Sequence, residues 1–360
     1  MKRNSFLAFL FILLVACKTA APSNETPQTA IQIPKPILTP TQSTQPPTIT
    51  PTANYAQYEI EKGMEEIAYS FPMIASSTSA IPLWEKVMHH IFGIESHWAI
   101  NYNSIYLANN LDMSDLGEFN QFYYDHVVAT GTHDAYLSLI NNQAEIILVA
   151  RKPSEDELNL AQEMEIELDV RPVALDAFVF MVNRQNPIDD LTTDLIRAIY
   201  SGELTNWQEL GWTDNPINAY QRNENSGSQE LMNDFVMQGT PMIDSPDMIL
   251  DSMGGPFTAI GAEPNLNHSG DVYGIGYTVH FYAKYMVSND NIEFIGINGI
   301  EPTTLTISDR SYPFTSEVYV VIRSDEGEDS TATLLRDWLL SKAGQMVVFS
   351  SGYIPIGEYR

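Results

Sequence analysis

Short apolar runs alternate along this chain with amphipathic helical patterns, and this alternation limits the fold more than any other feature. Four runs of five or six residues predict strands, namely Ile146–Ala150, Ala177–Val182, Ile292–Ile297 and Val318–Ile322. The stretches between them repeat apolar residues every three or four positions, as amphipathic helices do. Strands that alternate with helices argue for an α/β fold with a parallel or mixed sheet.

Hydroxyl residues mark the expected helix starts, and glycines mark several ends. A side-chain oxygen at the first position satisfies a free N–H of the opening turn, and glycine adopts the left-handed conformation that ends a helix. Ser154 with Glu157 forms a capping-box pattern. The same reasoning predicts helices that begin after Thr78-Ser79, Thr132, Thr192 and Ser226, with Gly93, Gly202 and Gly239 as ends of three of them.

The first residues have the pattern of an export signal. Lys2 and Arg3 precede an uncharged apolar run, Phe6–Ala16, which is shorter than the roughly 20 residues that span a bilayer. The run ends directly before Cys17, the only cysteine of the chain. This ending resembles the lipobox of bacterial lipoproteins, which implies that Cys17 carries lipid and that residues 1–17 are the signal with its lipidated cysteine. An ordinary signal peptide or a buried cysteine is the alternative.

A proline- and threonine-rich segment, 18–54, follows the cysteine. It holds eight prolines and nine threonines, with no glycine and no aromatic residue. Proline fixes φ and lacks an N–H, so such a segment favours extended polyproline II over a packed core. We expect a disordered linker that tethers the remainder of the chain.

The charge balance excludes several function classes. The chain has 46 acidic and 18 basic residues, a net charge of −28. A nucleic-acid binder needs a basic surface to displace counterions, so we expect no nucleic-acid partner. Adsorption to anionic lipid is excluded on the same ground, which leaves the lipid anchor as the expected membrane contact.

The strongest site signal is an arginine four residues before a Ser-Gly-Ser helix start. Arg222 can offer two parallel donors to one oxyanion, and Ser226 and Ser228 add hydroxyl donors. Gly227 lets an anion approach the free N–H groups of the helix N-terminus. The pattern predicts an anion-binding site; a plain serine cap with a surface arginine is the alternative.

At this point the chain resembles the phosphate-binding proteins of ABC phosphate-uptake systems, which have the type II periplasmic binding protein fold. Arg222 with Ser226-Gly227-Ser228 matches the family's Arg-x-x-x-Ser-Gly-Thr pattern, with Ser228 for Thr. The resemblance covers nearly all of 66–360, and its blocks appear in the family's order. The other matching blocks are Ser70–Leu83, Phe178–Gly211, Gly274–Ala283, Tyr312–Ile322 and Gly344–Ile356.

The resemblance implies two α/β lobes that close on an anion about a hinge near Pro172–Ala177 and Tyr312–Glu317. Lobe I is expected at 55–173 plus 314–360, and lobe II at 174–313. Lobe II would contribute Arg222, Ser226, Gly227 and Ser228. Lobe I would contribute two further loops, the first consisting of Ser77, Thr78, Ser79, Ala80 and Ile81 and the second of Thr130, Gly131 and Thr132.

One position departs from the family. Phosphate-binding members carry an aspartate after the strand that follows the second helix, where it accepts the proton of hydrogen phosphate. Here that position is Ala150 or Arg151. Glu224 is a candidate replacement, and a solvated loop carboxylate is the alternative for it.

The resemblance therefore predicts a monomeric, lipid-anchored extracytoplasmic protein that captures phosphate or a related oxyanion for the permease subunits of an ABC transporter. It implies no enzymatic activity, no metal and no cofactor. Two alternatives stay open, an anion sensor without a permease and a surface phosphoesterase. The esterase would need a nucleophile with its base or a two-metal carboxylate cluster, and neither pattern is visible in the sequence.

Overall fold

The computed structural model describes residues 64–93, 96–99, 104–107, 121–261, 270–287 and 289–357. The signal, Cys17 and the linker 18–54 lie outside the described residues. No helix within these ranges is both long and apolar enough to cross a membrane.

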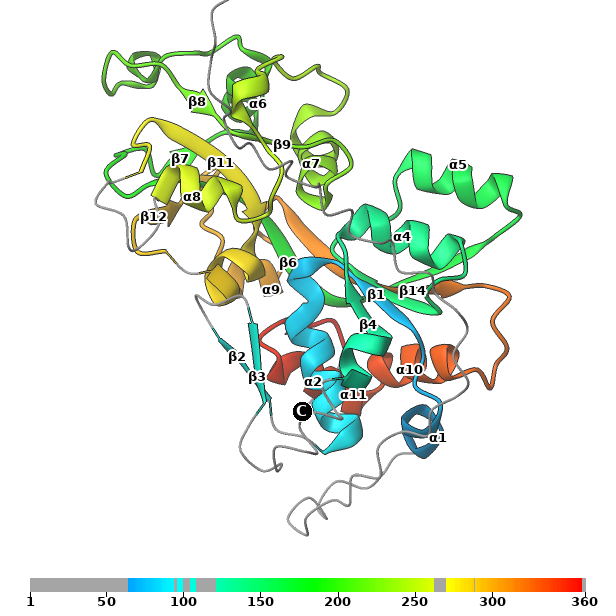
Figure 1. The fold of residues 1–360 in the computed structure, drawn as a ribbon. Helices are drawn as coiled ribbons and strands as arrows, with labels where there is room; N and C mark the ends of the chain where they lie inside the picture. Colours follow the sequence, from blue (N-terminus) through cyan, green and yellow to red (C-terminus); the bar gives the residue numbers. More distant parts are fainter. Residues whose placement is uncertain are drawn as a thin grey trace, which may run out of the picture. The chain divides into compact units, whose positions relative to one another are not determined.

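The described chain is built on one mixed sheet (Figure 1). Its order is β4-β1-β5-β14-β6-β11-β8, and β12 and β15 also pair with β6. The strand bounds are β1 Ile74–Ser76, β4 Val127–Ala129, β5 Ile146–Val149, β6 Leu168–Asn183, β8 Asn218–Ala219, β11 Gly274–Val279, β12 Ile292–Phe294, β14 Thr315–Arg323 and β15 Ile354–Pro355.

Strand β6 joins the two lobes. Its first part, up to Ala177, pairs antiparallel with β14 and β15, whereas its last part, from Phe178, pairs antiparallel with β11 and β12. The parallel strands β4, β1 and β5 extend the sheet in the first lobe, and β8 pairs parallel with β11 in the second. The fold is therefore α/β and two-lobed, as the sequence predicts. The exact lobe boundaries at 173/174 and 313/314 stay predictions.

Helices flank each part of the sheet. In the first lobe these are α1 Met64–Tyr69, η1 Thr78–Ala80, α2 Ile81–Phe92, α4 Thr132–Ile140, α5 Glu155–Glu163, α10 Thr331–Leu340 and α11 Lys342–Ser350. In the second they are α6 Thr193–Ser201, η2 Trp207–Leu210, α7 Gly227–Met232, η3 Asn233–Met237, η4 Pro246–Met248, α8 Gly255–Gly261, η5 Tyr282–Val287 and α9 Thr304–Ser308.

Three two-stranded ladders complete the described elements: β7 Asp190–Leu191 with β13 Gly296–Ile297, β9 Gln221–Arg222 with β10 Ile249–Leu250, and β2 Ser96–Ala99 with β3 Ser104–Leu107. The β2–β3 ladder lies between α2 and β4 in the sequence.

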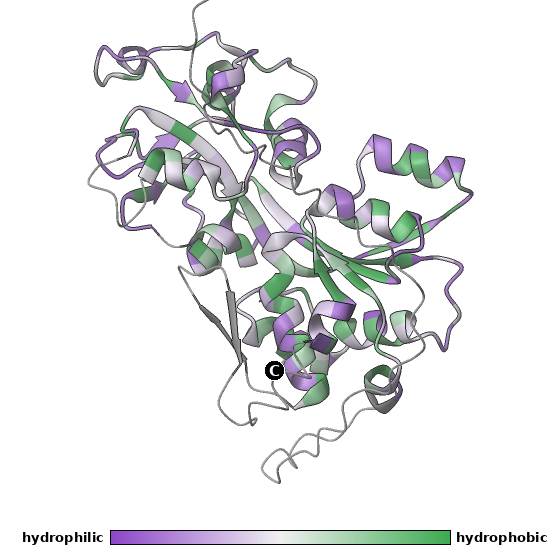
Figure 2. Ribbon diagram, in the orientation of Figure 1, coloured by the Kyte–Doolittle hydropathy of each residue, from purple (hydrophilic) through white to green (hydrophobic). Residues whose placement is uncertain are grey.

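The sheet strands form the core. All four residues of β5 are buried, as are the residues of β6 from Val173 to Asn183. Strands that are covered on both faces read as continuous apolar runs rather than as alternating ones. Figure 2 accordingly shows green, hydrophobic residues concentrated along the central strands.

Most predicted element boundaries are confirmed. Thr192 and Ser226 cap α6 and α7, and Gly93 and Gly202 take the left-handed conformation after α2 and α6. Two predictions need correction. The run Ile292–Ile297 divides into β12 and β13, which pair with different strands. Helix η3 ends one residue before the predicted glycine, because Gln238 is already left-handed, and Gly239 follows it with a positive φ as well.

Candidate functional site

Three loops of the first lobe lie side by side at the carboxyl ends of β4, β1 and β5. The N–H of Ser77 donates to the carbonyl of Leu148 at 2.9 Å, and the N–H of Thr130 donates to the carbonyl of Ser76 at 3.1 Å. Ligands of open α/β sheets bind at this edge. The structure therefore brings the two predicted loops of this lobe, Ser77–Ile81 and Thr130–Thr132, together.

The loop Ser77–Ile81 forms a 3₁₀ turn before helix α2 begins. Three of its N–H groups have partners within the chain: Ser77 donates to Leu148, Ala80 to Ser77 and Ile81 to Thr78. The N–H groups of Thr78 and Ser79 have no partner among the described residues. These two are therefore the donors that the loop can offer to an anion.

The second loop leads into helix α4. Gly131 occupies the cap position at φ 139°, a conformation that favours glycine. Thr130 is exposed, and its hydroxyl donates to the carbonyl of Gly131 at 3.1 Å. Thr132 is 5% exposed, and its hydroxyl has no hydrogen bond to any described residue. Thr132 is thus the better-placed hydroxyl donor of the two threonines.

The second lobe meets this loop at the start of α7. A Cβ atom built on Gly227 would lie 2.7 Å from Oγ1 of Thr132, so the two helix starts are in contact. The Ser226 hydroxyl accepts the N–H of Gln229 at 3.1 Å. The N–H groups of Gly227 and of buried Ser228 have no partner among the described residues. The helix start therefore keeps two N–H donors free beside Thr132.

Arg222 lies on β9, and its side chain is oriented by backbone carbonyls. Its Nε donates to the carbonyl of Leu250 at 2.8 Å, and its Nη2 donates to the carbonyl of Asp251 and to Oδ1 of Asn223, both at 3.2 Å. The residue is 8% exposed. Burial lowers the pKa of the guanidinium, and Tyr277, Tyr282 and Asp251 oppose this effect.

Within the described part of the chain, Arg222 is the one arginine with no carboxylate at ion-pair distance. Each other described arginine pairs with an Asp or Glu side chain: Arg151, Arg171, Arg184, Arg197, Arg310, Arg323 and Arg336. A buried cation is costly unless a charge or hydrogen bonds compensate it. A bound anion would supply the compensation that the carbonyl groups give only in part.

Gln229 connects Arg222 to the helix start, and the sequence analysis did not identify it. Its Oε1 accepts the backbone N–H of Arg222 at 3.3 Å and the hydroxyl of Tyr277 at 2.5 Å. Tyr277 also accepts the N–H of Arg222 at 3.0 Å. Gln229 stands three residues after Ser226, the capping-box spacing, which was the one local signal for it. Its contact with Tyr277 joins residues 48 positions apart, so no local sequence pattern indicates it.

The position that departs from the family forms an internal ion pair. Arg151 is 3% exposed, and its two Nη atoms donate to the two carboxylate oxygens of Glu157, each at 2.8 Å. Glu157 also accepts the N–H of Ser154 and contacts His133 Nδ1 at 2.9 Å. The charge of Arg151 is thus already neutralised, and Ala150 beside it is buried.

Two acidic residues lie near the candidate site. Glu224 is exposed and forms no ion pair with Arg222, so the structure gives no support for it as a proton acceptor. Glu230 lies in the first turn of α7, where burial raises its pKa and Arg151 lowers it. In the described ranges, no three His, Cys, Asp or Glu side chains converge as metal ligands would.

The comparisons with known proteins agree with this architecture. The family model described as the PBP superfamily domain matches residues 117–343, more than half of the chain. The phosphate-binding protein PstS of Pseudomonas aeruginosa is 25% identical over 302 residues, which cover 79% of this chain and 89% of that protein. PstS of Borreliella burgdorferi is 23% identical, with coverage of 63% and 78%.

Two solved structures share the fold. One is from Clostridium perfringens, named as a phosphate ABC transporter substrate-binding protein with bound phosphate. It has a TM-score of 0.55 and 21% identity, and the match covers 79% of this chain and 99% of that one. The other, an ABC-type phosphate transport receptor from Vibrio cholerae, has a TM-score of 0.53 and 18% identity, with coverage of 78% and 99%. On the family match and the two-lobed fold, the chain belongs to the PBP superfamily.

Proposed function

We propose that this chain binds phosphate or a related oxyanion between its two lobes and delivers it to the permease of an ABC transporter. The observation that carries the proposal is Arg222, a buried guanidinium that has no carboxylate partner in the described chain. Unpaired N–H groups of Thr78, Ser79, Gly227 and Ser228 add uncharged donors. The names of the relatives, which include phosphate-binding and phosphate transport proteins, support the same ligand class.

The donors fit an oxyanion in a strongly acidic protein. Free N–H groups at helix starts carry partial positive charge and bind anions through local contacts. Nε and Nη2 of Arg222 already donate to Leu250, Asp251 and Asn223, so its Nη1, which donates to no described residue, is the group that can add two charge-assisted hydrogen bonds. Together these local donors can hold an anion although the net charge of the chain is −28.

The choice among oxyanions depends on proton acceptors. Arg151 occupies the region of the family's aspartate, and its guanidinium is already paired with the carboxylate of Glu157. We therefore propose that the site relies on donors and does not require a protonated ligand. On this basis sulfate and molybdate are competitors of phosphate in this protein.

Calorimetric titration of the full chain with phosphate, sulfate, molybdate and a phosphonate tests the proposal. We expect at least one of the four to bind with a dissociation constant in the micromolar range or below. Failure of all four to bind contradicts the function. A chromogenic phosphate ester added in parallel tests the esterase alternative, for which we expect no turnover.

We also propose that Cys17 anchors the protein by lipid on the outer face of the cell membrane. The support is the apolar run Phe6–Ala16 before the only cysteine of the chain and the proline- and threonine-rich segment after it. Two acyl chains suffice for stable membrane attachment. Cys17→Ser should release the protein from membranes or leave the signal uncleaved. A mature mutant that still fractionates with membranes contradicts the anchor.

A further inference from the structure

Strand β6 changes its partners between Ala177 and Phe178, directly after Asp176. Leu175 pairs with Ile354 of β15 in the first lobe, whereas Phe178 pairs with Val279 of β11 in the second. Asp176 therefore stands where the strand passes from one lobe to the other.

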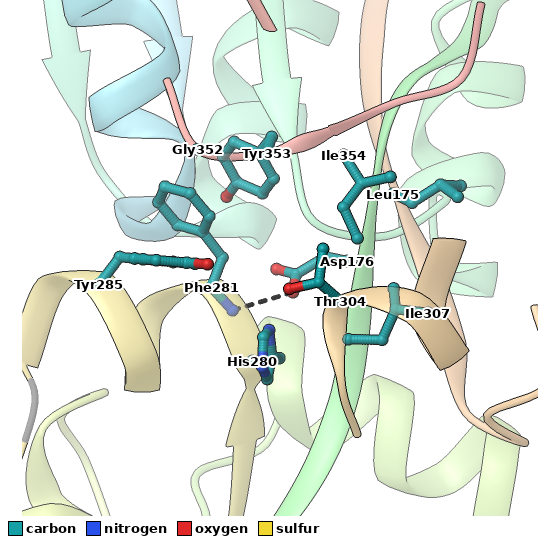
Figure 3. Close-up of a pocket in the computed structure, with 10 residues that line it drawn as sticks. All are labelled: Leu175, Asp176, His280, Phe281, Tyr285, Thr304, Ile307, Gly352, Tyr353 and Ile354. Atoms are coloured by element: carbon teal, nitrogen blue, oxygen red, sulfur yellow. Dashed lines mark hydrogen bonds between the residues drawn. The ribbon is translucent and has the colours of Figure 1, made fainter. Parts of the chain in front are cut away.

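The Asp176 carboxyl group bonds to both lobes. The residue is 3% exposed, and its Oδ1 accepts the N–H of Ala177 at 2.8 Å and the N–H of Phe281 at 2.9 Å (Figure 3). Phe281 follows β11 in the second lobe. The other oxygen, Oδ2, is buried and has no hydrogen-bond partner among the described residues. Only half of the carboxyl group is thus compensated.

A series of contacts links Asp176 to the candidate anion site. The ring of Phe281 stacks on Tyr353 with centroids 3.7 Å apart and planes 7° from parallel. The hydroxyl of Tyr353 donates to the carbonyl of Ser79 at 2.8 Å. Because Ser79 offers one of the free N–H groups, three contacts in series, through Phe281 and Tyr353, join the Asp176 carboxyl group to the candidate ligand loop.

A small pocket opens beside the carboxyl group (Figure 3). The centre of a water molecule can occupy about 20 Å³ of it, which exceeds the roughly 10–15 Å³ that one water needs. The pocket is therefore large enough to hold a water molecule beside Asp176. The pocket is lined by Leu175, Asp176, His280, Phe281, Tyr285, Thr304, Ile307, Gly352, Tyr353 and Ile354.

None of the described side chains that surround Asp176 forms an ion pair with it. His280 follows β11, and Tyr285 lies in η5. Lys284, also in η5, is exposed and does not line the pocket. Burial, with a contribution from Lys284, lowers the pKa of His280 to about 4, so this imidazole is neutral near pH 7. Burial and the proximity of Asp176 raise the pKa of Tyr353, which stays neutral as well.

The remaining elements around Asp176 add no charge to its environment. Helix α9 contributes Thr304 and Ile307 to the pocket. Strand β14 places Ser316 opposite Asp176, and the next residue, Glu317, pairs with Arg310. Burial without a neighbouring cation raises the pKa of Asp176 to about 7, although the N–H groups of Phe281 and Ala177 act in the opposite direction.

We propose that Asp176 is a proton-operated hinge residue: the neutral carboxyl group stabilises the closed arrangement of the lobes, and its ionisation favours a more open, hydrated hinge. The affinity test of this inference rests on the proposed function, because it needs an oxyanion ligand. The hinge motion itself can be tested without a ligand.

The sign of the effect follows from the two states. In a hydrated hinge the carboxyl would titrate near the ordinary value for aspartate, about 3.9, whereas in the closed hinge it titrates near 7. Closure therefore takes up a proton between these values. As the pH rises from about 4 to about 7, the closed form loses stability relative to the open form. Above pH 7 the difference stays constant.

Ligand affinity gives the first test. Dissociation constants of the full chain and of Asp176→Asn are measured for phosphate from pH 5 to pH 8.5, and their ratio cancels the titration of phosphate itself. An asparagine keeps the acceptor for Phe281 and cannot ionise. We expect the ratio of unmodified chain to variant to rise at least tenfold between pH 5 and pH 7.5 and then to level off. Asp244→Asn, which removes an exposed carboxylate, should leave a flat ratio.

A ligand-free distance measurement gives the second test. Spin labels at Glu163→Cys and Asp234→Cys, both exposed and one in each lobe, report the lobe separation in a Cys17→Ser background. We expect a longer distance population at pH 8 than at pH 5, and no such change in Asp176→Asn. Unchanged distances in the chain with Asp176 overturn the hinge proposal whether or not phosphate binds. Absence of binding with the expected distance change overturns the proposed function alone.

Discussion

Gly227 and Thr132 bring the two lobes into contact: a Cβ atom on Gly227 would lie 2.7 Å from Oγ1 of Thr132. Gly227 opens helix α7 of the second lobe, and Thr132 opens α4 of the first. The two helix starts thus lie side by side, and the absence of a side chain at Gly227 is what permits this approach. The contact makes Gly227 a sensitive position for closure.

Gly227→Ala should weaken oxyanion binding by at least about tenfold, or about 1.4 kcal/mol, because the added methyl group separates the helix starts. The free energy of unfolding should change little, since alanine suits a helix. In a Thr132→Ala background the same change should cost less, because the clashing oxygen is gone. Calorimetry measures the affinities. Gly327→Ala, where a Cβ meets nothing within 4 Å, is the control. Equal affinities of Gly227→Ala and this control would contradict the closed contact.

Arg222 should contribute the largest single share of the binding free energy. A hydrogen bond to a charged group contributes roughly 1.5–3 kcal/mol, and the guanidinium offers two. Arg222→Ala should therefore weaken binding by roughly 30- to 1000-fold, or about 2–4 kcal/mol. Arg222→Lys should recover only part, because an ammonium cannot keep the bonds to Leu250 and Asp251 and also offer the two N–H groups of Nη1.

The matched control for Arg222 is Arg184→Ala, which removes the same charge from an exposed ion pair with Glu293. Affinity within threefold of the unmodified chain for Arg222→Ala would mean that the anion binds elsewhere. Circular dichroism of each variant separates loss of binding from loss of the fold.

Ser226 and Thr192 allow the cap and the ligand contact to be separated. Both hydroxyls accept an N–H three residues later, from Gln229 and Leu195 at 3.1 and 3.2 Å. Replacement of either by alanine should lower the free energy of unfolding by about 0.5–2 kcal/mol. Only Ser226→Ala should also weaken binding, by about 1 kcal/mol or roughly fivefold, since backbone donors remain. Urea denaturation and calorimetry measure the two effects. If Ser226→Ala binds the anion as tightly as Thr192→Ala does, the Ser226 hydroxyl caps the helix and does not contact the ligand.

Local chemistry explains which parts of the structure the sequence predicts. The starts of α6 and α7 follow from Thr192 and Ser226, because cap hydrogen bonds join residues three positions apart. The strand predicted at Ala177–Val182 is confirmed as part of β6, but β6 begins earlier, at Leu168. Its first residues alternate in polarity over only four positions before Pro172 interrupts the pattern, and they pair with β14, more than 140 positions away.

The candidate site divides in the same way. Arg222 and the Ser-Gly-Ser start are visible as one motif, whereas the contact between Gly227 and Thr132 depends on the approach of two lobes. The Asp176 bond to Phe281 joins residues 105 positions apart. Such contacts arise from tertiary packing and leave no spacing that a single sequence reveals.

The Arg151–Glu157 pair gives a stability prediction that is independent of any ligand. Both side chains are almost fully buried, and two 2.8 Å hydrogen bonds join them. Glu157→Gln leaves a buried guanidinium without its charge partner, and such losses cost about 3–5 kcal/mol. Urea denaturation should show this decrease with an unchanged dependence on urea concentration.

Two controls define the Arg151–Glu157 result. Glu293→Gln breaks the exposed pair with Arg184, with side chains 62% and 53% exposed, and should cost no more than about 1 kcal/mol. Arg151→Met combined with Glu157→Leu removes both charges and should recover most of the loss, because neither ion is then left unpaired. A loss of less than about 1 kcal/mol for Glu157→Gln would mean that water reaches the guanidinium and compensates it. In that case Arg151 would also be accessible to an anion in the cleft, and the donor set proposed for the site would have to include it.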